Sequence, residues 1–180
     1  MKSLLLLVAL LVGTVATGTS LPLPGVLSQP SIRILKSARE LRLYSGNQLL
    51  RTYRVGLGLN PGPAKRRAGD NATPEGSYFV CVKNPHSAFF LSLGLSYPGQ
   101  ADADRGLKAG LITASQHRQI LIAAQRKVVP PWNTALGGTI FIHGHGSASD
   151  WTWGCIALDD PDIKELYPRI PVGTPVRIDP

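Results

Sequence analysis

The chain has 180 residues, of which 43% are hydrophobic and 17% charged, and its 19 glycines and 15 prolines recur along its whole length. This is the composition of a globular protein, and it favours one compact, turn-rich β or α+β domain over a long-helix architecture. The net charge of +8 suits a polyanionic surface, although an ordinary soluble surface with extra lysines and arginines explains it equally well.

The first twenty residues have the organisation of a secretory signal. Lys2 supplies a positive charge, residues 4–12 form an apolar run, and small residues at 16–20 offer a cleavage site. The run is shorter than the roughly 20 apolar residues that cross a bilayer, and no cysteine stands at the cleavage site to carry a lipid. We therefore expect a signal peptide over residues 1–20, with an uncleaved membrane anchor as the alternative. Export argues against a nucleic-acid partner.

The stretch after this leader begins with a tether. Residues 21–30 are rich in proline and are expected to form a short link to one domain over residues 31–180. Partial alternation of apolar residues over 31–35 predicts an edge strand. The stretches 40–44 and 48–55 are joined by a Ser-Gly-Asn turn, which predicts a β-hairpin.

The middle of the chain alternates between loops and strands. The stretch 56–70 is rich in glycine, proline and cations, and is expected to be a loop. Residues 77–83 and 89–95 have strand-like apolar patterns, whereas the polar stretch 97–107 is expected to consist of turns.

One convincing helix is predicted over residues 112–127. Apolar residues recur there at helical spacing, Ser115 can cap the start, and two cations stand at the end. Residues 137–143 predict an apolar strand, 162–167 a short helix and 175–178 a closing strand.

The segment that carries chemistry begins where an apolar strand ends in His143. A polar loop follows, and Gly154 precedes Cys155. A nucleophilic cysteine requires a nearby imidazole as base, and it requires backbone N–H groups aimed at the oxyanion, which a preceding glycine would leave unobstructed. Spacing alone also leaves open a metal site of His143, His145, Asp150 and Cys155, or a buried structural cysteine.

The second cysteine, Cys81, lies in a predicted strand. A disulfide with Cys155 is the default for two exported cysteines, whereas a chain of this size buries enough core without one. We expect Cys81 to pack as a small hydrophobic residue. A disulfide would exclude Cys155 as a nucleophile.

Several ordered motifs surround these residues. Ile142-His143-Gly144 ends a strand, and Thr152-Trp153-Gly154-Cys155-Ile156 follows it. Upstream are the hairpin residues 42–44 and the Thr-Pro-Glu-Gly turn at 73–76, and downstream is the strand at 172–178. Together, over residues 35–178, they resemble the L,D-transpeptidase (YkuD-type) catalytic domain family.

The form of the cysteine motif is similar to one subgroup of that family. Asp-Trp-Thr-x-Gly-Cys-Ile-Ala resembles murein-acting members, which include enzymes that cut wall linkages. Trp153 stands where many members have histidine or another polar residue, and Ala157 where many have arginine. These departures leave open whether the acyl group passes to an amine or to water.

The resemblance implies a mainly β (α+β) fold, either a β-sandwich or a partly closed barrel with a few short helices. It implies acyl transfer on peptidoglycan stem peptides, with Cys155 as nucleophile and His143 as base. The N–H groups of Gly154 and Cys155 would stabilise the oxyanion, and Thr152 would steady His143. His145 is the alternative base. The resemblance implies no cofactor and no metal.

Substrate contacts are expected from Gly144, His145, Trp151 and Trp153, although the two tryptophans fit a plain core equally well. An amine acceptor would make the protein a transpeptidase, and water would make it a murein hydrolase (L,D-carboxypeptidase or amidase). A non-catalytic wall-binding module and an exported cysteine peptidase are rivals from other classes. The expected location is the periplasm or cell envelope. Basic patches are expected to associate peripherally with the wall or a membrane surface.

Overall fold

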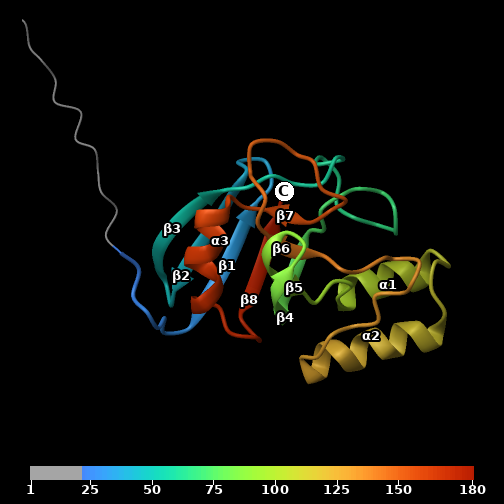
Figure 1. Ribbon diagram of the computed structural model, residues 1–180. Helices are drawn as coiled ribbons and strands as arrows, with labels where there is room; N and C mark the ends of the chain where they lie inside the picture. The colour runs from blue at the N-terminus through green and yellow to red at the C-terminus, as the bar shows by residue number, and fades with distance from the viewer. Residues whose placement is uncertain (1–21) are drawn as a thin grey trace, which may run out of the picture.

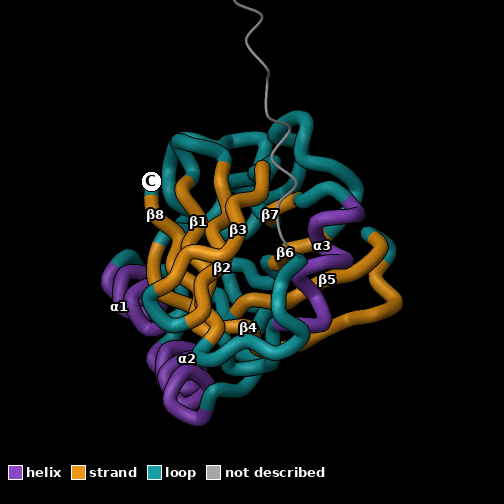
Figure 2. The backbone as a smooth tube through the Cα atoms, turned by 90° about the vertical axis from the view of Figure 1, so that its left-hand side faces the viewer, coloured by secondary structure: helices purple, strands orange, loops and turns teal. Residues whose placement is uncertain are grey.

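The computed structural model describes residues 22–180, so the expected signal peptide at residues 1–20 lies outside the described residues. Eight strands form one sheet in the order β3-β2-β1-β8-β4-β5-β6-β7, which curls into a half-barrel with α3 on one side and the α1–α2 pair on another (Figures 1 and 2). The strands are β1 (Pro30–Leu35), β2 (Glu40–Ser45), β3 (Gln48–Arg54), β4 (Gly76–Ser87), β5 (Phe90–Leu95), β6 (Phe141–His143), β7 (Ile156–Ala157) and β8 (Pro175–Asp179). The helices are α1 (Gln100–Lys108), α2 (Ala114–Arg126), α3 (Asp160–Leu166) and the 3₁₀ turn η1 (Tyr167–Arg169).

The predicted hairpin of β2 and β3 is confirmed, but β1 is an interior strand and not an edge strand. It pairs antiparallel with β2 and parallel with the last strand, β8. In that parallel pair Ile32 lies opposite Val176 and Ile34 opposite Ile178, and all four side chains are buried. Alternation over 31–35 predicted a strand correctly, but the partner that makes it interior lies more than 140 residues away.

The two edges of the sheet are joined through backbone hydrogen bonds. Gly56 follows β3, and Ala157 belongs to β7; each N–H donates to the carbonyl of the other, at 2.9 and 2.8 Å. A Cβ on Gly56 would lie 2.2 Å from the carbonyl oxygen of Ser149, so only glycine fits this approach. The fold is therefore the partly closed barrel of the two predicted alternatives.

The main core fills the inside of the curl. Its sheet side chains come from the inward faces of the strands, α3 contributes Ile163 and Leu166, and Ile170 follows η1. The predicted helix at 162–167 is thus confirmed as α3, which packs against β5. A smaller cluster of Ala103, Ile112, Ile120 and Leu136 holds the α1–α2 pair.

The stretch 97–107, expected to be turns, contains α1. The sequence of α1 has few apolar residues and so lacks the apolar spacing that predicts a helix. A buried carboxylate, Asp102, ties this helix to the sheet instead. This carboxylate accepts hydrogen bonds from the Tyr78 hydroxyl at 3.0 Å and from the Gly99 N–H at 2.9 Å. The predicted helix at 112–127 is confirmed as α2, but Thr113 caps it in place of Ser115, by accepting from the Gln116 N–H.

The segment 137–143 forms a shorter strand than expected. Gly137 and Thr139 have φ angles of +82° and +52°, which interrupt extended backbone, so β6 begins only at Phe141. Its neighbour β7, of two residues, was not predicted.

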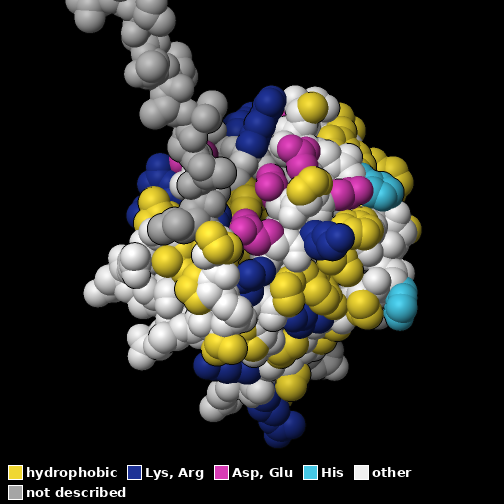
Figure 3. Space-filling view, turned by 60° about the vertical axis from the view of Figure 1, so that its left-hand side comes forward, with side chains coloured by type: hydrophobic (Ala, Val, Ile, Leu, Met, Phe, Trp, Pro, Cys, Tyr) yellow, Lys and Arg dark blue, Asp and Glu magenta, His cyan; other side chains and the backbone are white. Residues whose placement is uncertain are grey.

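The proline-rich stretch before β1 lies against the domain over its described part. Leu23 and Leu27 are buried, and the Arg169 guanidinium donates to the carbonyls of Leu23 and Pro24. On the side that carries α3, acidic side chains gather among basic and hydrophobic ones (Figure 3); the first turn of α3 holds Asp160 and Asp162. Among residues 22–180, no helix has both the length and the apolar character needed to cross a membrane.

Candidate active site

Cys155 and His143 line one cavity of about 390 Å³. Both residues reach this cavity because β6 and β7 are parallel neighbours, with His143 opposite Ala157, two residues beyond the cysteine. The remaining lining residues are Asn84, Ser87, Ala88, Phe89, Ser92, Gly138, Thr139, Ile140, Phe141 and Trp153.

His143 is held in one orientation by its neighbours. Its Nδ1 lies 2.7 Å from the carbonyl oxygen of Gly144, and because a carbonyl only accepts, Nδ1 carries the proton in the neutral ring. Nε2 is then the unprotonated nitrogen that can act as a base. Phe89 stacks on the imidazole at 4.6 Å between ring centroids, and Trp151 meets it edge-on at 5.6 Å.

Burial keeps this imidazole neutral. His143 is only 2% exposed, and burial lowers its pKa below the usual value; the Gly144 carbonyl acts in the opposite direction, and the nearby His145 adds to the lowering. A neutral imidazole at physiological pH is the form that a general base requires.

The Cys155 thiol rests in its protonated form. Sγ accepts a hydrogen bond from the Phe141 N–H at 3.4 Å and donates its own proton to the Thr139 carbonyl at 3.6 Å. Burial raises the pKa of Cys155, whereas the Phe141 N–H and the Lys65 ammonium lower it. The resting pair is thus a neutral thiol with a neutral imidazole.

The turn before the cysteine requires glycine. Gly154 has a φ of +121°, and a Cβ there would lie 2.6 Å from the carbonyl oxygen of Ala72. The Thr152 hydroxyl accepts from the Gly154 N–H at 3.1 Å and donates to the Cys155 carbonyl at 2.8 Å. These two bonds fix the backbone that presents the thiol.

Two expected roles on this turn are corrected by these contacts. Thr152 does not contact His143: its hydroxyl holds the turn, and its carbonyl accepts from the Leu59 N–H at 2.9 Å. The Gly154 N–H is occupied by the Thr152 hydroxyl, so it is not free to donate to an oxyanion. Of the two expected donors, the Cys155 N–H remains.

Three of the four expected substrate contacts line one of two cavities, and Gly144 lines neither. Trp153 is 81% exposed and lines the cavity of Cys155. His145 and Trp151 line a second cavity of about 380 Å³, which shares Phe89 with the first. His145, the alternative base, therefore lies outside the set of residues that surround the thiol. Gly144 permits close packing, because a Cβ would lie 2.4 Å from Asp160 Oδ1.

Sequence reasoning did not single out Phe89, Asn84 or Thr139. Phe89 stacks on the His143 imidazole although it is 41% exposed. Phe89 lies in the turn between β4 and β5, just before Phe90, whose φ is +69°. An aromatic residue in a turn was the only sign of its role in the sequence. Thr139 contributes only its carbonyl to the thiol, which the identity of its side chain does not reveal.

Asp150 and Cys81 are engaged elsewhere. Asp150 accepts from the Arg39 guanidinium and from the Leu57 N–H, and the described part of the chain contains no group of three or more side chains suited to a metal. Cys81 is buried against the Gly94 carbonyl at 3.4 Å, and burial raises its pKa to about 11. Both cysteines are free thiols.

Comparisons with known proteins agree with this geometry. The family model described as the L,D-transpeptidase catalytic domain, YkuD, matches residues 29–178. No curated protein was found to match the chain.

Among solved structures, Bd1075 of Bdellovibrio bacteriovorus has a TM-score of 0.56 at 22% identity, covering 85% of this chain and 48% of its own. The helical cell shape determining protein Pgp2 from Campylobacter jejuni has a TM-score of 0.57 at 21% identity, and the match covers 83% of this chain and 47% of Pgp2. An L,D-transpeptidase from Mycobacterium smegmatis has a TM-score of 0.51 at 11% identity, and the match covers 85% of this chain and 59% of the other. These likenesses show the fold, and the chain spans about half the length of the first two structures.

Proposed function

The chain belongs to the L,D-transpeptidase catalytic domain family, and on that premise we propose that it is a peptidoglycan-acting cysteine acyl-transferase. Cys155 is the nucleophile and His143 the general base. The observation that carries the proposal is the shared cavity, in which a free thiol lies with a buried imidazole whose Nε2 is unprotonated. A wall-binding module without catalysis would have no use for this pair.

The reaction proceeds through a thioester. Nε2 of His143 takes the thiol proton as Sγ attacks the carbonyl carbon of a stem-peptide amide, and the oxyanion accepts a hydrogen bond from the Cys155 N–H. The C–N bond then breaks, and the imidazolium gives its proton to the departing amine. An amine acceptor attacks the thioester, forms a new amide and restores the thiol; water in its place yields a carboxylate.

The surrounding residues support this chemistry in different ways. Thr152 and Gly154 hold the turn that carries the nucleophile. Phe89 stacks on the imidazole and Trp151 meets it edge-on, and together they restrict its orientation. The exposed indole of Trp153, at the cavity of Cys155, offers a surface for the stem peptide, and His145 lies in the neighbouring cavity as a further substrate contact.

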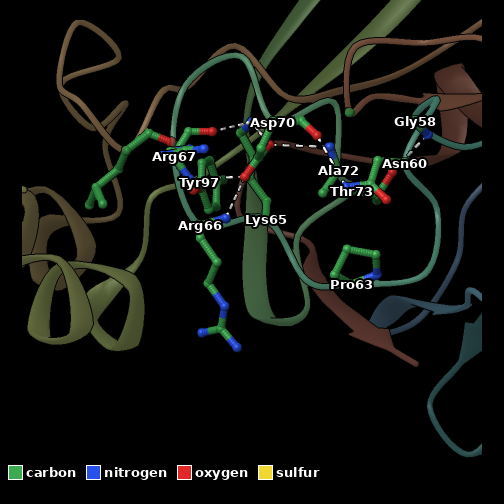
Figure 4. Close-up of polar contacts among 12 residues, drawn as sticks. Gly58, Asn60, Pro63, Lys65, Arg66, Arg67, Asp70, Ala72, Thr73 and Tyr97 are labelled. Atoms are coloured by element: carbon green, nitrogen blue, oxygen red, sulfur yellow. Dashed lines mark hydrogen bonds and ion pairs between the residues drawn. The ribbon is translucent and has the colours of Figure 1, made fainter. Parts of the chain in front are cut away.

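The setting of the activity is part of the proposal. Residues 1–20 act as the signal peptide, 21–30 as the link, and 31–180 as the catalytic domain, which works in the periplasm or cell envelope. The Pgp2 neighbour is named as a cell shape determining protein, and we extend a role in cell shape to this chain. Basic stretches at 66–67 and 118–127 provide peripheral contact with the wall or a membrane surface, whereas the adjoining Lys65 is buried against Asp70 (Figure 4).

The test is incubation of the purified mature protein, and of Cys155→Ala, with defined muropeptides, followed by mass spectrometry. Crosslinked or exchanged products from the wild type alone would establish a transpeptidase. Shortened stems from the wild type alone would establish a murein hydrolase on the same site. Unchanged muropeptides would reject both and favour a wall-binding module, and digestion of an unfolded protein substrate alone would favour a cysteine peptidase.

A further inference from the structure

The sheet face that lines the active-site cavity carries a row of polar side chains, of which the reaction above uses only His143. β5 pairs with β6 so that Ser92 lies opposite His143, and β4 pairs with β5 so that Asn84 lies opposite Ser92. Residues directly opposite one another share a face of the sheet, with Cβ atoms about 4.5–5.5 Å apart. All three side chains line the cavity of Cys155. The row therefore continues from the imidazole across two further strands, away from the thiol.

The alternation of side chains along β5 and β6 shows which way this row faces. Leu93 and Ile142 are fully buried in the main core. Their neighbours in the chain are Ser92 and His143, and successive side chains of a strand point to opposite faces. These two residues therefore face away from the core and into the cavity. Ser92 is only 3% exposed, whereas Asn84 is exposed at the solvent side of the row.

The row has hydrogen-bonding capacity that the protein itself does not use. Asn84 Oδ1 accepts from the His86 N–H at 2.9 Å, so the Nδ2 amino group is left as a donor. Within residues 22–180, neither that amino group nor the Ser92 hydroxyl makes a hydrogen bond. Buried hydroxyls normally have a partner. Because Ser92 has none in the described part of the chain and lines the cavity, its partner comes from the cavity.

The cavity lining indicates that this partner is uncharged. None of the described residues that line the cavity is Asp, Glu, Lys or Arg. A carboxylate or an ammonium group bound there would lack a counter-ion, and burying an unpaired charge is costly. An amide fits the row, because its carbonyl can accept from the Asn84 amino group and its N–H can donate to the Ser92 oxygen.

We propose that Ser92 is a substrate-binding residue, which together with Asn84 holds a peptide amide of the stem beside the bond that Cys155 attacks. The inference rests on the proposed function, because it takes the stem peptide as the substrate. Neighbouring strands lie about 4.8 Å apart, so the two contacts engage the part of the substrate next to its reacting carbonyl. Ser92 fixes the substrate and leaves the reactivity of the thiol unchanged.

The experiment compares muropeptide turnover with the alkylation of Cys155 by iodoacetamide, a small electrophile that needs no contact with the row. Ser92→Ala should lower kcat/KM for the muropeptide about three- to tenfold, chiefly through KM. Its rate of alkylation against pH should remain that of the wild type. Ser92→Thr keeps the hydroxyl and should restore most of the turnover.

A second variant tests the donor of the row. Asn84→Asp keeps an acceptor for the His86 N–H but replaces the amino group with a second acceptor. The muropeptide kcat/KM should therefore fall at least as far as in Ser92→Ala. Wild-type turnover by Asn84→Asp would contradict the part that the amino group plays in binding.

Ser96→Ala is the matched control. Ser96 is a similarly buried serine just after β5, at 5% exposed, but its hydroxyl accepts from the Phe79 N–H at 3.0 Å. Its loss should lower the melting temperature by about 2–8 °C and leave KM unchanged. Ser92→Ala should do the reverse, with a melting temperature within about 2 °C of the wild type.

Three results would overturn the inference. Unchanged kcat/KM in Ser92→Ala, with an active wild type, would overturn it alone. Alkylation slowed as much as turnover would mean that Ser92 acts on the Cys155–His143 pair and not on the substrate. A wild type that leaves every muropeptide unchanged would contradict the proposed function itself and this inference with it.

Discussion

Cys155 and His143 share one cavity, and burial favours the uncharged form of both side chains. The thiol therefore keeps its proton, donated to the Thr139 carbonyl, until the base withdraws it. The fixed Nδ1–H bond to Gly144 gives the imidazole one available lone pair, on Nε2. At this scale the site depends on backbone carbonyls as much as on side chains.

The lowered pKa of His143 makes folding stability depend on pH. Its pKa in the unfolded chain is about 6.5, so below that pH the unfolded state binds more protons and stability falls as pH falls. We expect the wild type to lose stability between pH 7.5 and pH 5.5, as urea unfolding measures it, and His143→Gln to lose less. Equal losses in the two proteins would contradict the assigned neutral, buried imidazole.

The two thiols should differ sharply in reactivity. Cys81 is buried, with a pKa raised to about 11, whereas Cys155 lines an open cavity beside a base. Iodoacetamide at neutral pH should modify one thiol per native chain, located at Cys155 by peptide mass spectrometry, and both after denaturation. Two equally fast thiols, or none, would conflict with this account.

At the scale of elements, the turn before Cys155 is supported by one hydroxyl. Thr152→Val preserves the shape of the side chain but leaves the Gly154 N–H without its acceptor. We expect a loss of about 1–3 kcal/mol in the free energy of unfolding and a strong loss of muropeptide turnover. Thr152→Ser keeps the hydroxyl and should stay close to the wild type, so equal effects of both variants would refute the hydrogen-bond role.

The glycine of the same turn has two reasons to be glycine. Gly154→Ala combines a positive φ with a collision against the Ala72 carbonyl. Gly173, with a φ of +94° and open space around it, separates the two effects. Gly173→Ala should cost about 1 kcal/mol in thermal unfolding, and Gly154→Ala distinctly more together with most of the activity. A Gly154→Ala protein with normal turnover would show that the close approach is dispensable.

Elements with local signals could be predicted from the sequence. The turn at Gly46, the strand ending in His143 and the apolar spacing of α2 are all properties of neighbouring residues. α1 was missed because it is tied to the sheet by Asp102, a charged residue whose partner Tyr78 is distant in sequence. β1 was predicted to be an edge strand because its second partner, β8, lies at the far end of the chain and leaves no local pattern.

On the scale of the whole molecule, the site lies where the two edges of the curled sheet meet. Gly56 pairs with Ala157, and the Leu59 N–H donates to the Thr152 carbonyl. The loop after β3 therefore supports the turn that carries Cys155. The cysteine motif was visible in the sequence, but this support was not, because a hydrogen bond between backbones nearly 100 residues apart depends on closure and leaves no pattern of side chains. The sequence likewise did not show that His145 lines the neighbouring cavity and not the cavity of Cys155.

Closure also depends on an ion pair between Arg39 and Asp150, which are 111 residues apart in the sequence. Asp150 accepts from Arg39 and from the Leu57 N–H, whereas Asp179 pairs with the more exposed Arg33 and Arg177. Asp150→Ala should lower the free energy of unfolding by about 1–3 kcal/mol, and Asp179→Ala by about 1 kcal/mol or less. Denaturant titration of both variants checks this, and the reverse order would contradict the role of Asp150 in closure.

The central claim, that Cys155 forms a thioester with a murein stem peptide, is tested most directly by trapping the acyl-enzyme. The mature protein is mixed with a defined muropeptide, quenched in acid and analysed as intact protein and as peptides. The account predicts a mass increase equal to the substrate less its departing amine, located on Cys155, labile to hydroxylamine and absent from Cys155→Ala. Turnover without any adduct on Cys155, or undiminished turnover by Cys155→Ala, would contradict it.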